Sequence, residues 1–531
     1  MKRLFFLWLP FFMLTKGASQ NTFEYTLELN PITIQNLPGL HSYAFGQSDG
    51  KWLIIGGRRD GLHARQPFNA FPASQNNDEL FVIDLANQTF WSTPLTPLPT
   101  GIREQLQSTN MNFHQDGDTL YIIGGYAFSA TQNNHITFPN LTSINVPATI
   151  NAIINNQDIT PFFKQISDAI FAVSGGQLAK LGATFYLVGG HKFNGRYNPM
   201  GNPTYTQEYT NAIRKFTIDN SGSQLSYDNY TTIEDPVHLH RRDYNLLPQV
   251  FPNGTEGLTI SSGVFQQNVD LPYLYPVDID AAGITPMTSF NQFLSNYHSA
   301  SAYLRDASSN TMFSLFFGGM SQYYYQNGNL IQDDLVPFVK TISLLVRDNT
   351  NTLEEFQLPI EMPIYTGSSA EFILNENLPH YGSGIVKLSE ITEESFVLGY
   401  IYGGINSSSL NPFSSNQTNL TSASAAIYEV TLTKEPLGIQ KIDGSNPYQI
   451  SLSPNPATQE VQVTFNKAPL ANSYYFLTTV EGKIARQGAM SFQGLTSRIV
   501  LPKELSAQTY FLTVSIDDRY FVTKKLFVDS Q

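Results

Sequence analysis

At 531 residues the chain is longer than one ordinary hydrophobic core supports, so two or more folding units are expected. Aromatic residues make up 13% and charged residues 14% of the chain, a composition that is typical of strands and turns and argues against helical bundles and coiled coils. The net charge of −13 and the lack of basic runs beyond the first few residues argue against nucleic-acid binding, and the absence of cysteine excludes disulfides and thiolate metal sites.

The first 19 residues have the pattern of a secretory signal peptide. Lys2 and Arg3 precede an apolar run over 4–14, and small residues follow at 17–19. The run is too short to span a membrane as a stable helix, and it is flanked as cleavage requires. Because no later segment is long and apolar enough to be transmembrane, the sequence predicts an exported protein with no membrane span once the leader is removed.

An apolar strand that runs into a glycine doublet occurs five times along the chain. The five copies are WLIIGG at 52–57, LYIIGG at 120–125, FYLVGG at 185–190, LFFGG at 315–319 and YIYGG at 400–404. A sixth, degraded copy, LTISSGVF, lies at 258–265, between the third and the fourth. The spacing between copies varies, which is typical of a supersecondary unit whose loops absorb insertions.

The segments around each doublet predict one four-stranded blade. A strand and a polar turn precede each doublet, and a loop and two further strands follow it, as in NDELFVIDLANQTFWS at 77–92. This pattern resembles kelch repeats, although the usual tryptophan appears only once, at Trp91. Six copies predict an all-β fold, a six-bladed kelch-like β-propeller over 20–435 that is followed by a small C-terminal β-sandwich.

The two ends of the propeller predict how its ring closes. The strand at 22–32 has no partner before the first blade, and the sixth blade lacks a clear fourth strand. An open ring would expose two strand edges. We therefore expect the first strand to complete the sixth blade, and we expect no blade to be stable alone, because each blade contacts only its neighbours.

Arginine and histidine gather at one set of loops in a chain where charge is scarce. In a four-stranded blade, the loops that join strands two and three emerge on the same face as the loops that join one blade to the next. The candidate ligand-binding residues on that face are Arg58, Arg59, Asp60, His63, His191, His240, Arg241, Arg242, Asp243 and His298. Arginine binds carboxylates through a fork of N–H groups, and aromatic faces stack on sugar rings. The pattern favours a binding protein that recognises a glycan, an acidic small molecule or a protein.

Two other interpretations of the same residues stay open. The Arg-Arg-Asp triplets at 58–60 and 241–243 can equally tie adjacent blades together, in which case the protein is a structural surface protein. The second is a carbohydrate-active enzyme, epimerase- or hydrolase-like, that uses the same face and has Glu371 or Asp243 as a convergent carboxylate near the axis. The kelch-type sialic-acid epimerases offer an analogy that rests on architecture and on arginine, histidine and glutamate content alone. The activity of galactose oxidase is excluded, because its radical cofactor requires a cysteine.

No metal site and no cofactor are predicted. A zinc or copper site needs three or four converging ligands, and HLH at 238–240 supplies only two imidazoles. The acidic stretches DGD at 116–118 and VDID at 277–280 lack the ligands of a calcium loop and are expected to be turn and strand-edge residues. The tyrosines at 323–325 are expected either to pack a blade or to form a sugar platform.

The character of the chain changes after a predicted linker at 436–447. Residues 448–531 alternate apolar residues with Pro-Asn-Pro, Glu-Gly and Asp-Asp turns, which predicts a small antiparallel sandwich. Its motifs in chain order are SPNPAT at 453–458, EGK at 481–483, YFL at 510–512 and TKKL at 523–526. The segment resembles the C-terminal type A sorting domain of the type IX secretion system of Bacteroidetes. The resemblance implies that the type IX secretion machinery is a partner and that the protein is secreted or attached to the outer cell surface.

Overall fold

The computed structural model describes residues 23–66, 68–199, 204–435 and 440–529; the leader predicted at 1–19 and part of the predicted linker lie outside these ranges. Strands dominate, and the described residues contain two α-helices, α1 (Thr100–Leu106) and α2 (Val146–Ile154). The short 3₁₀ helices in these ranges are η1 (Ala73–Gln75), η2 (Thr160–Phe162), η3 (Ala169–Phe171), η4 (Leu388–Glu390) and η5 (Thr418–Leu420). No helix in the described ranges is long and apolar enough to cross a membrane.

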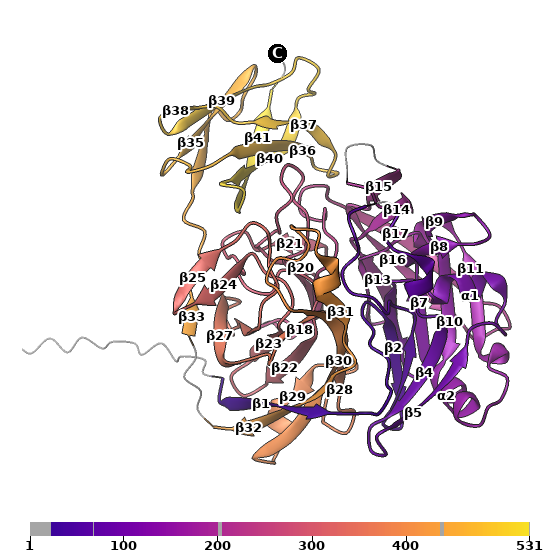
Figure 1. Ribbon diagram of the computed structural model, residues 1–531. Helices are drawn as coiled ribbons and strands as arrows, with labels where there is room; N and C mark the ends of the chain where they lie inside the picture. Colours follow the sequence, from indigo (N-terminus) through magenta and orange to yellow (C-terminus); the bar gives the residue numbers. More distant parts are fainter. Residues whose placement is uncertain (1–22, 67, 200–203, 436–439, 530–531) are drawn as a thin grey trace, which may run out of the picture.

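Six sheets, each built on four antiparallel strands, form the blades of a β-propeller, which confirms the predicted fold (Figure 1). From the innermost strand outward, blades one to three are β2 (Ala44–Ser48), β3 (Lys51–Ile55), β4 (Glu79–Asp84) and β5 (Thr89–Pro94); β6 (Asn112–Asp116), β7 (Thr119–Ile123), β10 (Asn140–Asn145) and β11 (Phe163–Ser167); and β12 (Gln177–Leu181), β13 (Thr184–Val188), β16 (Ala212–Asp219) and β17 (Ser226–Glu234). Blades four to six are β18 (Asn245–Val250), β19 (Glu256–Ser261), β20 (Val277–Ile279) and β21 (Ile284–Pro286); β22 (Ser301–Asp306), β23 (Thr311–Phe317), β26 (Thr341–Arg347) and β27 (Leu353–Glu361); and β28 (Tyr365–Leu374), β30 (Ser395–Ser407), β32 (Ile427–Lys434) and β1 (Tyr25–Ile32).

Short strands decorate this framework. The loops between the second and third strands carry three hairpins, β8 (Tyr126–Ser129) with β9 (Asn134–Thr137), β14 (His191–Gly195) with β15 (Tyr205–Tyr209), and β24 (Tyr323–Gln326) with β25 (Asn329–Gln332). We call the side of the propeller on which these loops emerge the hairpin face, and the side on which the first and second strands are joined the opposite face. Three additional strands extend the blades, β29 (Val386–Lys387) beside β22, β31 (Thr421–Ala423) beside β30 and β33 (Gln440–Ile442) beside β27.

The ring is closed by the first strand of the chain, as predicted. Strand β1 pairs antiparallel with β32, in a register that runs from Tyr25 opposite Lys434 to Ile32 opposite Ile427. It supplies the outermost strand of a blade whose other strands come from the far end of the propeller. Closure covers the edge of β32, which would otherwise be open to pairing with another chain.

Removal of this strand is expected to open the propeller. A chain that begins at residue 33 loses Phe23 and Leu27, which are 1% and 5% exposed, and each buried side chain of this size contributes about 1.5–3 kcal/mol. We expect a lower melting temperature and aggregation in the thermal scan. A peptide of residues 23–32 added in trans should restore the melting temperature, whereas a truncated chain that melts like the full one would contradict closure by β1.

The core lies between neighbouring blades. In β3, Leu53 and Ile55 contact the second blade, while Trp52 and Ile54 contact the sixth. Successive side chains of a strand point to opposite faces, and both faces of each blade are covered. This is why the second strands read as continuous apolar runs in the sequence.

The glycine doublets join each blade to the next one. The second doublet residue donates its N–H to a carbonyl oxygen near the start of the innermost strand of the following blade, at 2.8–3.2 Å in all six blades. The six bonds are Gly57 to Ser108, Gly125 to Val173, Gly190 to Arg241, Gly263 to Asn296, Gly319 to Thr366 and Gly404 to Leu40. Gly263 thus confirms that 258–265 is the sixth copy. At Gly124 the φ angle is +68°, and a Cβ would collide with the carbonyl oxygen of Val173, so both the conformation and the close approach require glycine.

The C-terminal segment folds into the predicted β-sandwich of two four-stranded sheets. In sheet order they are β34 (Ile450–Ser453), β35 (Glu460–Phe465), β39 (Thr496–Val500) and β38 (Phe492–Gln493), and β37 (Ile484–Ala489), β36 (Ser473–Thr479), β40 (Gln508–Ile516) and β41 (Tyr520–Val528). Phe521 of the sandwich packs against Tyr273 and Tyr275 of the fourth blade, with ring centroids 5.7 and 4.8 Å away. Gln266 Nε2 donates to the carbonyl oxygen of Asp518 at 2.7 Å. The sandwich therefore sits on the hairpin face, near β15 and β25 in Figure 1.

Candidate functional site

A closed ring of backbone hydrogen bonds surrounds the propeller axis. Each blade contributes one residue, which lies just before its innermost strand or, in the sixth blade, within β28. The N–H of each donates to the carbonyl oxygen of the residue from the preceding blade, at 2.7–3.2 Å. The ring residues are Ser42, Asn110, Gly175, Asp243, His298 and Ser369. Five of them have φ between +51° and +65°; the exception is His298. The ring fixes the start of every inner strand and so positions the side chains that face the axis.

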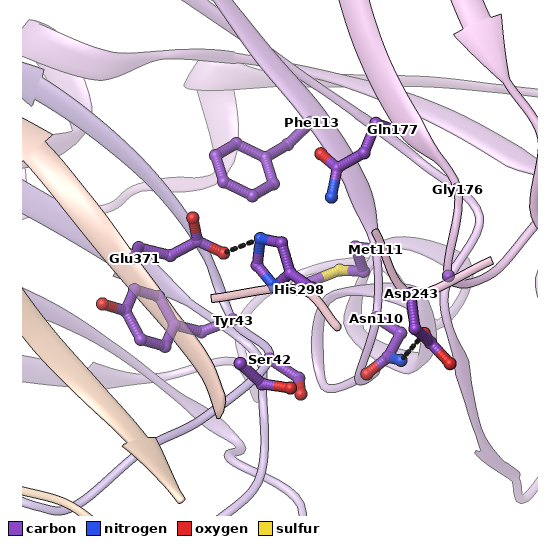
Figure 2. Close-up of a pocket in the computed structure, with 12 residues that line it drawn as sticks. Ser42, Tyr43, Asn110, Met111, Phe113, Gly176, Gln177, Asp243, His298 and Glu371 are labelled. Atoms are coloured by element: carbon purple, nitrogen blue, oxygen red, sulfur yellow. Dashed lines mark hydrogen bonds and ion pairs between the residues drawn. The ribbon is translucent and has the colours of Figure 1, made fainter. Parts of the chain in front are cut away.

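A narrow cavity lies at this ring, and Figure 2 shows the side chains that line it. Besides ring residues, its wall includes Tyr43, Met111, Phe113, Gln177 and Glu371. Its volume is about 30 Å³, room for one or two water molecules. The space along the propeller axis is therefore narrow at the ring.

The cavity widens away from the ring into a channel between the inner strands. A chamber of about 210 Å³ shares Phe113, Gln177, His298 and Glu371 with the narrow cavity, and we call it the inner chamber. A second chamber of about 400 Å³, the outer chamber, shares Phe45, His114, Ser301, Tyr303, Phe372 and Ser383 with the inner one. Gly117 of the β6–β7 turn and several residues of 374–386 line the outer chamber. Both segments connect a first strand to a second strand, so the channel widens toward the opposite face.

His298 and Glu371 meet where the channel begins to narrow (Figure 2). His298 Nε2 lies 3.6 Å from Glu371 Oε1, and the two side chains are 20% and 13% exposed. Glu371 lies on β28, and His298 is held in the axial ring through its own backbone. An imidazole and a carboxyl group from neighbouring blades are thus held side by side with little contact to bulk water.

Burial shifts both groups toward their neutral forms. It raises the pKa of the Glu371 carboxyl group well above its usual range. It lowers the pKa of His298 to about 4, although the nearby Asp243 carboxylate opposes this shift. Burial therefore favours a carboxylic acid beside a neutral imidazole. In such a pair the carboxylic acid can donate a proton, and the free lone pair of the imidazole can accept one. General acid–base catalysis requires both.

Two tyrosines form part of the wall near the pair. The Tyr43 hydroxyl donates to the Tyr402 carbonyl oxygen at 2.9 Å. The Tyr303 hydroxyl lies 2.6 Å from Ser301 Oγ, and burial raises the pKa of Tyr303 to about 12. Both phenols therefore stay protonated.

Asp243 lines the narrow cavity but is fully engaged. Asn110 Nδ2 donates to its Oδ1 at 3.0 Å, and Arg242 forms an ion pair with it. The Asp243 carboxylate is therefore held within the ring, and Glu371 is the carboxyl group of the inner chamber, where it has no arginine partner.

Arg58 and Asp60 come together, but as a tie within one loop. Arg58 is 2% exposed, and its Nε donates to Asp60 Oδ1 at 2.8 Å while its Nη1 donates to Asn76 Oδ1 at 2.9 Å. Arg59 turns away and donates to Glu79 Oε2 at 2.6 Å. All these partners belong to the first blade. The triplet at 58–60 therefore stabilises its own loop, and not a pair of adjacent blades.

Arg241 is not on the accessible face where the sequence analysis placed it. It is 0% exposed, and its guanidinium lies between the rings of Tyr273 and Tyr275, 4.4 Å from each centroid. Its Nη1 donates to the carbonyl oxygens of Ser262 and Tyr275 at 2.7 and 2.8 Å. The prediction was wrong about exposure, because adjacent arginines in a strand-like segment point to opposite sides.

Three other predicted residues converge around Tyr209 on the hairpin face. Arg242 Nε donates to the Tyr209 hydroxyl at 3.2 Å, and the His240 ring stacks on the Tyr209 ring at 3.8 Å. His191 lies at the edge of the same ring, 5.9 Å away. This group is separate from the channel, whose wall includes none of the three among the described residues.

His63 belongs to an aromatic cluster on the hairpin face. It stacks on Phe71 at 4.5 Å and meets Tyr197 and Phe413 edge-on at 4.7 and 5.4 Å. Burial lowers the pKa of His63 to about 4. The loops of blades one, three and six thus meet through this ring.

The acidic stretches and the tyrosine run have structural partners. Lys180 forms an ion pair with Asp116, and Asp278 is paired with Arg347. Tyr323 packs on Phe293 with ring centroids 4.7 Å apart. Within the described residues, no cluster of three or more histidine, aspartate or glutamate side chains could hold a metal ion.

Most of the channel wall was missed by the sequence analysis. Gln177 and Asn245 line the inner chamber, and each lies two residues after a ring residue, as Glu371 does. Residues two apart in a strand share a side, so counting by two from the ring positions would have indicated them. The missing information was which residue of each blade stands at the ring.

Comparison with known proteins gives matches among solved structures. No family model and no curated protein matches the sequence. Among solved structures, a fungal alcohol oxidase of the AA5 family in complex with copper is 10% identical, with a TM-score of 0.36, over 94% of this chain and 99% of that one. YjhT is 11% identical, with a TM-score of 0.40, over 74% of this chain and 97% of that one. Similarity at this level says nothing about the site or its chemistry.

Proposed function

We propose that this protein is a carbohydrate-active enzyme that transfers a proton on a neutral sugar bound in the axial channel, with Glu371 as acid and His298 as base. The observation that carries the proposal is the buried carboxyl–imidazole pair, 3.6 Å apart, at the inner end of a channel. In this scheme His298 Nε2 accepts the proton that leaves the substrate, and Glu371 donates one to a substrate oxygen. The protein ends with its net charge unchanged, because one group gains the proton that the other loses.

The charges of the wall favour a neutral ligand over an acidic one. Among the described residues that line the three cavities, Lys180 is the only lysine or arginine, and its ammonium is paired with Asp116. Sites for carboxylates or phosphates present free arginine forks or lysines. An anionic sugar would find no unpaired cation in the described wall of this channel.

The remaining wall suits a sugar. Phe45, Phe113 and Phe372 supply aromatic surface, while Gln177 supplies an amide. Binding sites for small molecules combine a mostly apolar lining with a few placed polar groups. A sugar ring offers C–H faces to the former and hydroxyls to the latter.

Proton transfer fits the pair better than glycoside hydrolysis. Most glycoside hydrolases use two carboxyl groups that flank the scissile bond. Here the second carboxylate at the narrow cavity, Asp243, is held by Asn110 and Arg242. One carboxylic acid with one neutral imidazole instead matches an epimerase- or isomerase-like step at a carbon beside a carbonyl group.

The test is exchange of substrate protons for deuterium. Neutral aldoses, ketoses and N-acetylhexosamines are incubated with the full chain in D₂O and followed by ¹H NMR. We expect loss of one C–H signal or appearance of an epimer, and a rate about 10²- to 10⁴-fold lower for Glu371→Gln. Glu208→Gln, the same change at an exposed site on β15, is the matched control and should react like the wild type. If a sugar bound without exchange for deuterium, the protein would be a binding protein and not an enzyme. If no sugar bound, the channel would not be the site.

A second candidate function is recognition of a glycan or protein on the hairpin face. The observation that favours it is the group of Arg242, His240 and His191 around Tyr209, which joins a cation to stacked rings. An Arg242→Ala variant of confirmed fold should then lose binding on a glycan array. Retained binding would assign the contacts of Arg242 to fold stability alone.

We further propose that residues 448–531 are a type IX sorting domain and that the protein is secreted or attached to the outer cell surface. The order of the motifs from 453 to 526 supports this. In a Bacteroidetes host, the full chain is expected in the medium or on the cell surface, whereas a chain that ends at residue 447 should stay in the periplasm. Equal export of both chains would overturn the proposal.

A further inference from the structure

The axial channel is wide at one end and constricted at the other. Its volume falls from about 400 Å³ in the outer chamber to 210 Å³ in the inner chamber and 30 Å³ at the ring. Only water-sized molecules fit the last of these spaces. The ring cannot widen without breaking hydrogen bonds between neighbouring blades. A ligand larger than water must therefore enter and leave from the opposite face, toward which the outer chamber widens.

The reactive pair stands at the closed end. His298 and Glu371 line both the narrow cavity and the inner chamber, and neither lines the outer one. The unit of a ligand that reaches the pair is consequently its leading end. A chain that continued past the pair would have to pass the ring.

The outer chamber has its own lining for a second unit. Phe45 and Phe372 extend into it from the inner chamber, and Gln47, Gln115 and Glu376 add polar groups around them. This repeats the combination of apolar surface and a few polar groups found deeper in the channel.

A single loop forms much of the outer wall. The connection between β28 and β30 contributes residues between Leu374 and Val386, including His380 and Ser383. The loop is anchored, because β29 pairs with β22 and the Tyr381 hydroxyl accepts from Arg305 Nη1 at 2.6 Å. The neighbouring blade thus fixes the position of the loop at the wide end of the channel, which we call the mouth.

We propose that the channel is a chain-end site: the terminal unit of a neutral oligosaccharide occupies the inner chamber, and the next unit occupies the outer chamber against the 374–386 loop. This inference rests on the proposed function and adds to it the substrate class, the end of a chain and not a free monosaccharide alone or a chain interior. The loop then selects the linkage and the second sugar.

Gly382 allows a direct test of the outer chamber. It lines the mouth, a Cβ there would meet no atom within 4 Å, and its φ lies outside the left-handed region. Gly382→Trp therefore places a large ring in the mouth without strain. Gly222→Trp is the matched control, since Gly222 is exposed in the β16–β17 turn and a Cβ there meets only atoms 3.8 Å or more away.

The experiment measures affinity by calorimetry for glucose, galactose and mannose, for linear neutral disaccharides and trisaccharides built from them, and for cyclic α-cyclodextrin. We expect linear disaccharides of one linkage to bind at least tenfold more tightly than their monosaccharides, and the cyclic sugar, which has no end, not to bind. Gly382→Trp should remove the gain from the second unit, whereas Gly222→Trp should keep it.

The outcomes separate the two proposals. If neither these sugars nor the ketoses and N-acetylhexosamines of the exchange test bind, the proposed function fails and the chain-end site fails with it. If monosaccharides bind, but a second unit adds nothing and Gly382→Trp changes nothing, the chain-end site alone is overturned. Binding of the cyclic sugar as tightly as its linear counterpart would also overturn it.

Discussion

Replacement of Arg347 by leucine should lower the free energy of unfolding by about 3–5 kcal/mol, because it leaves a buried carboxylate without its partner. Arg347 is 2% exposed on β26 of the fifth blade. Its two terminal nitrogens donate to both oxygens of Asp278 on β20 of the fourth blade, at 2.9 and 2.6 Å. The pair therefore joins two adjacent blades at a point that water does not reach.

Urea titration of the full chain measures the loss, and two further variants show its cause. In the Arg347→Leu background, Asp278→Asn removes the uncompensated charge and should restore part of the stability. Glu390→Gln, which breaks the more exposed pair with Lys387, is the control and should cost less than about 1 kcal/mol. Additive losses for Arg347→Leu and Asp278→Asn would contradict the interaction.

The sequence analysis predicted the propeller from periodic features that physical constraints repeat in every blade. Each doublet must pass close to the next blade, so glycine recurs even where the rest of the copy has changed, as at Gly263. The strand at 22–32 was assigned to the sixth blade because an unpaired edge is costly. Both arguments depend on local backbone needs, which a single sequence displays.

The candidate site was harder to predict, because it depends on which way side chains point. The neighbours Arg241 and Arg242 look alike in the sequence, yet one is enclosed by two tyrosine rings and the other donates to Tyr209. Glu371 was named as a candidate carboxylate, whereas its proximity to His298 depends on the register of two neighbouring blades. The arginines also led to a predicted site on the hairpin face, whereas the wall of the channel is mostly uncharged.

The pH dependence of catalysis gives the sharpest test of the acid–base pair. His298 must be neutral to accept a proton, and burial lowers its pKa to about 4, so activity should rise with pH through that value. Glu371 must be protonated to donate, and burial raises its pKa well above the usual carboxyl range, so activity should fall as pH rises through that raised pKa. The expected profile of kcat/KM is a bell, with an acid limb from His298 and an alkaline limb from Glu371.

Variants at the two positions should change the limbs separately. Glu371→Gln keeps the shape of the side chain but has no acidic proton, so we expect a rate about 10²- to 10⁴-fold lower and no alkaline limb in what remains. His298→Asn should lose the acid limb in the same way. If the alkaline limb survived in Glu371→Gln, another group would be the acid. If both variants kept wild-type rates, the channel would be a binding site and the pair would contribute only to its shape.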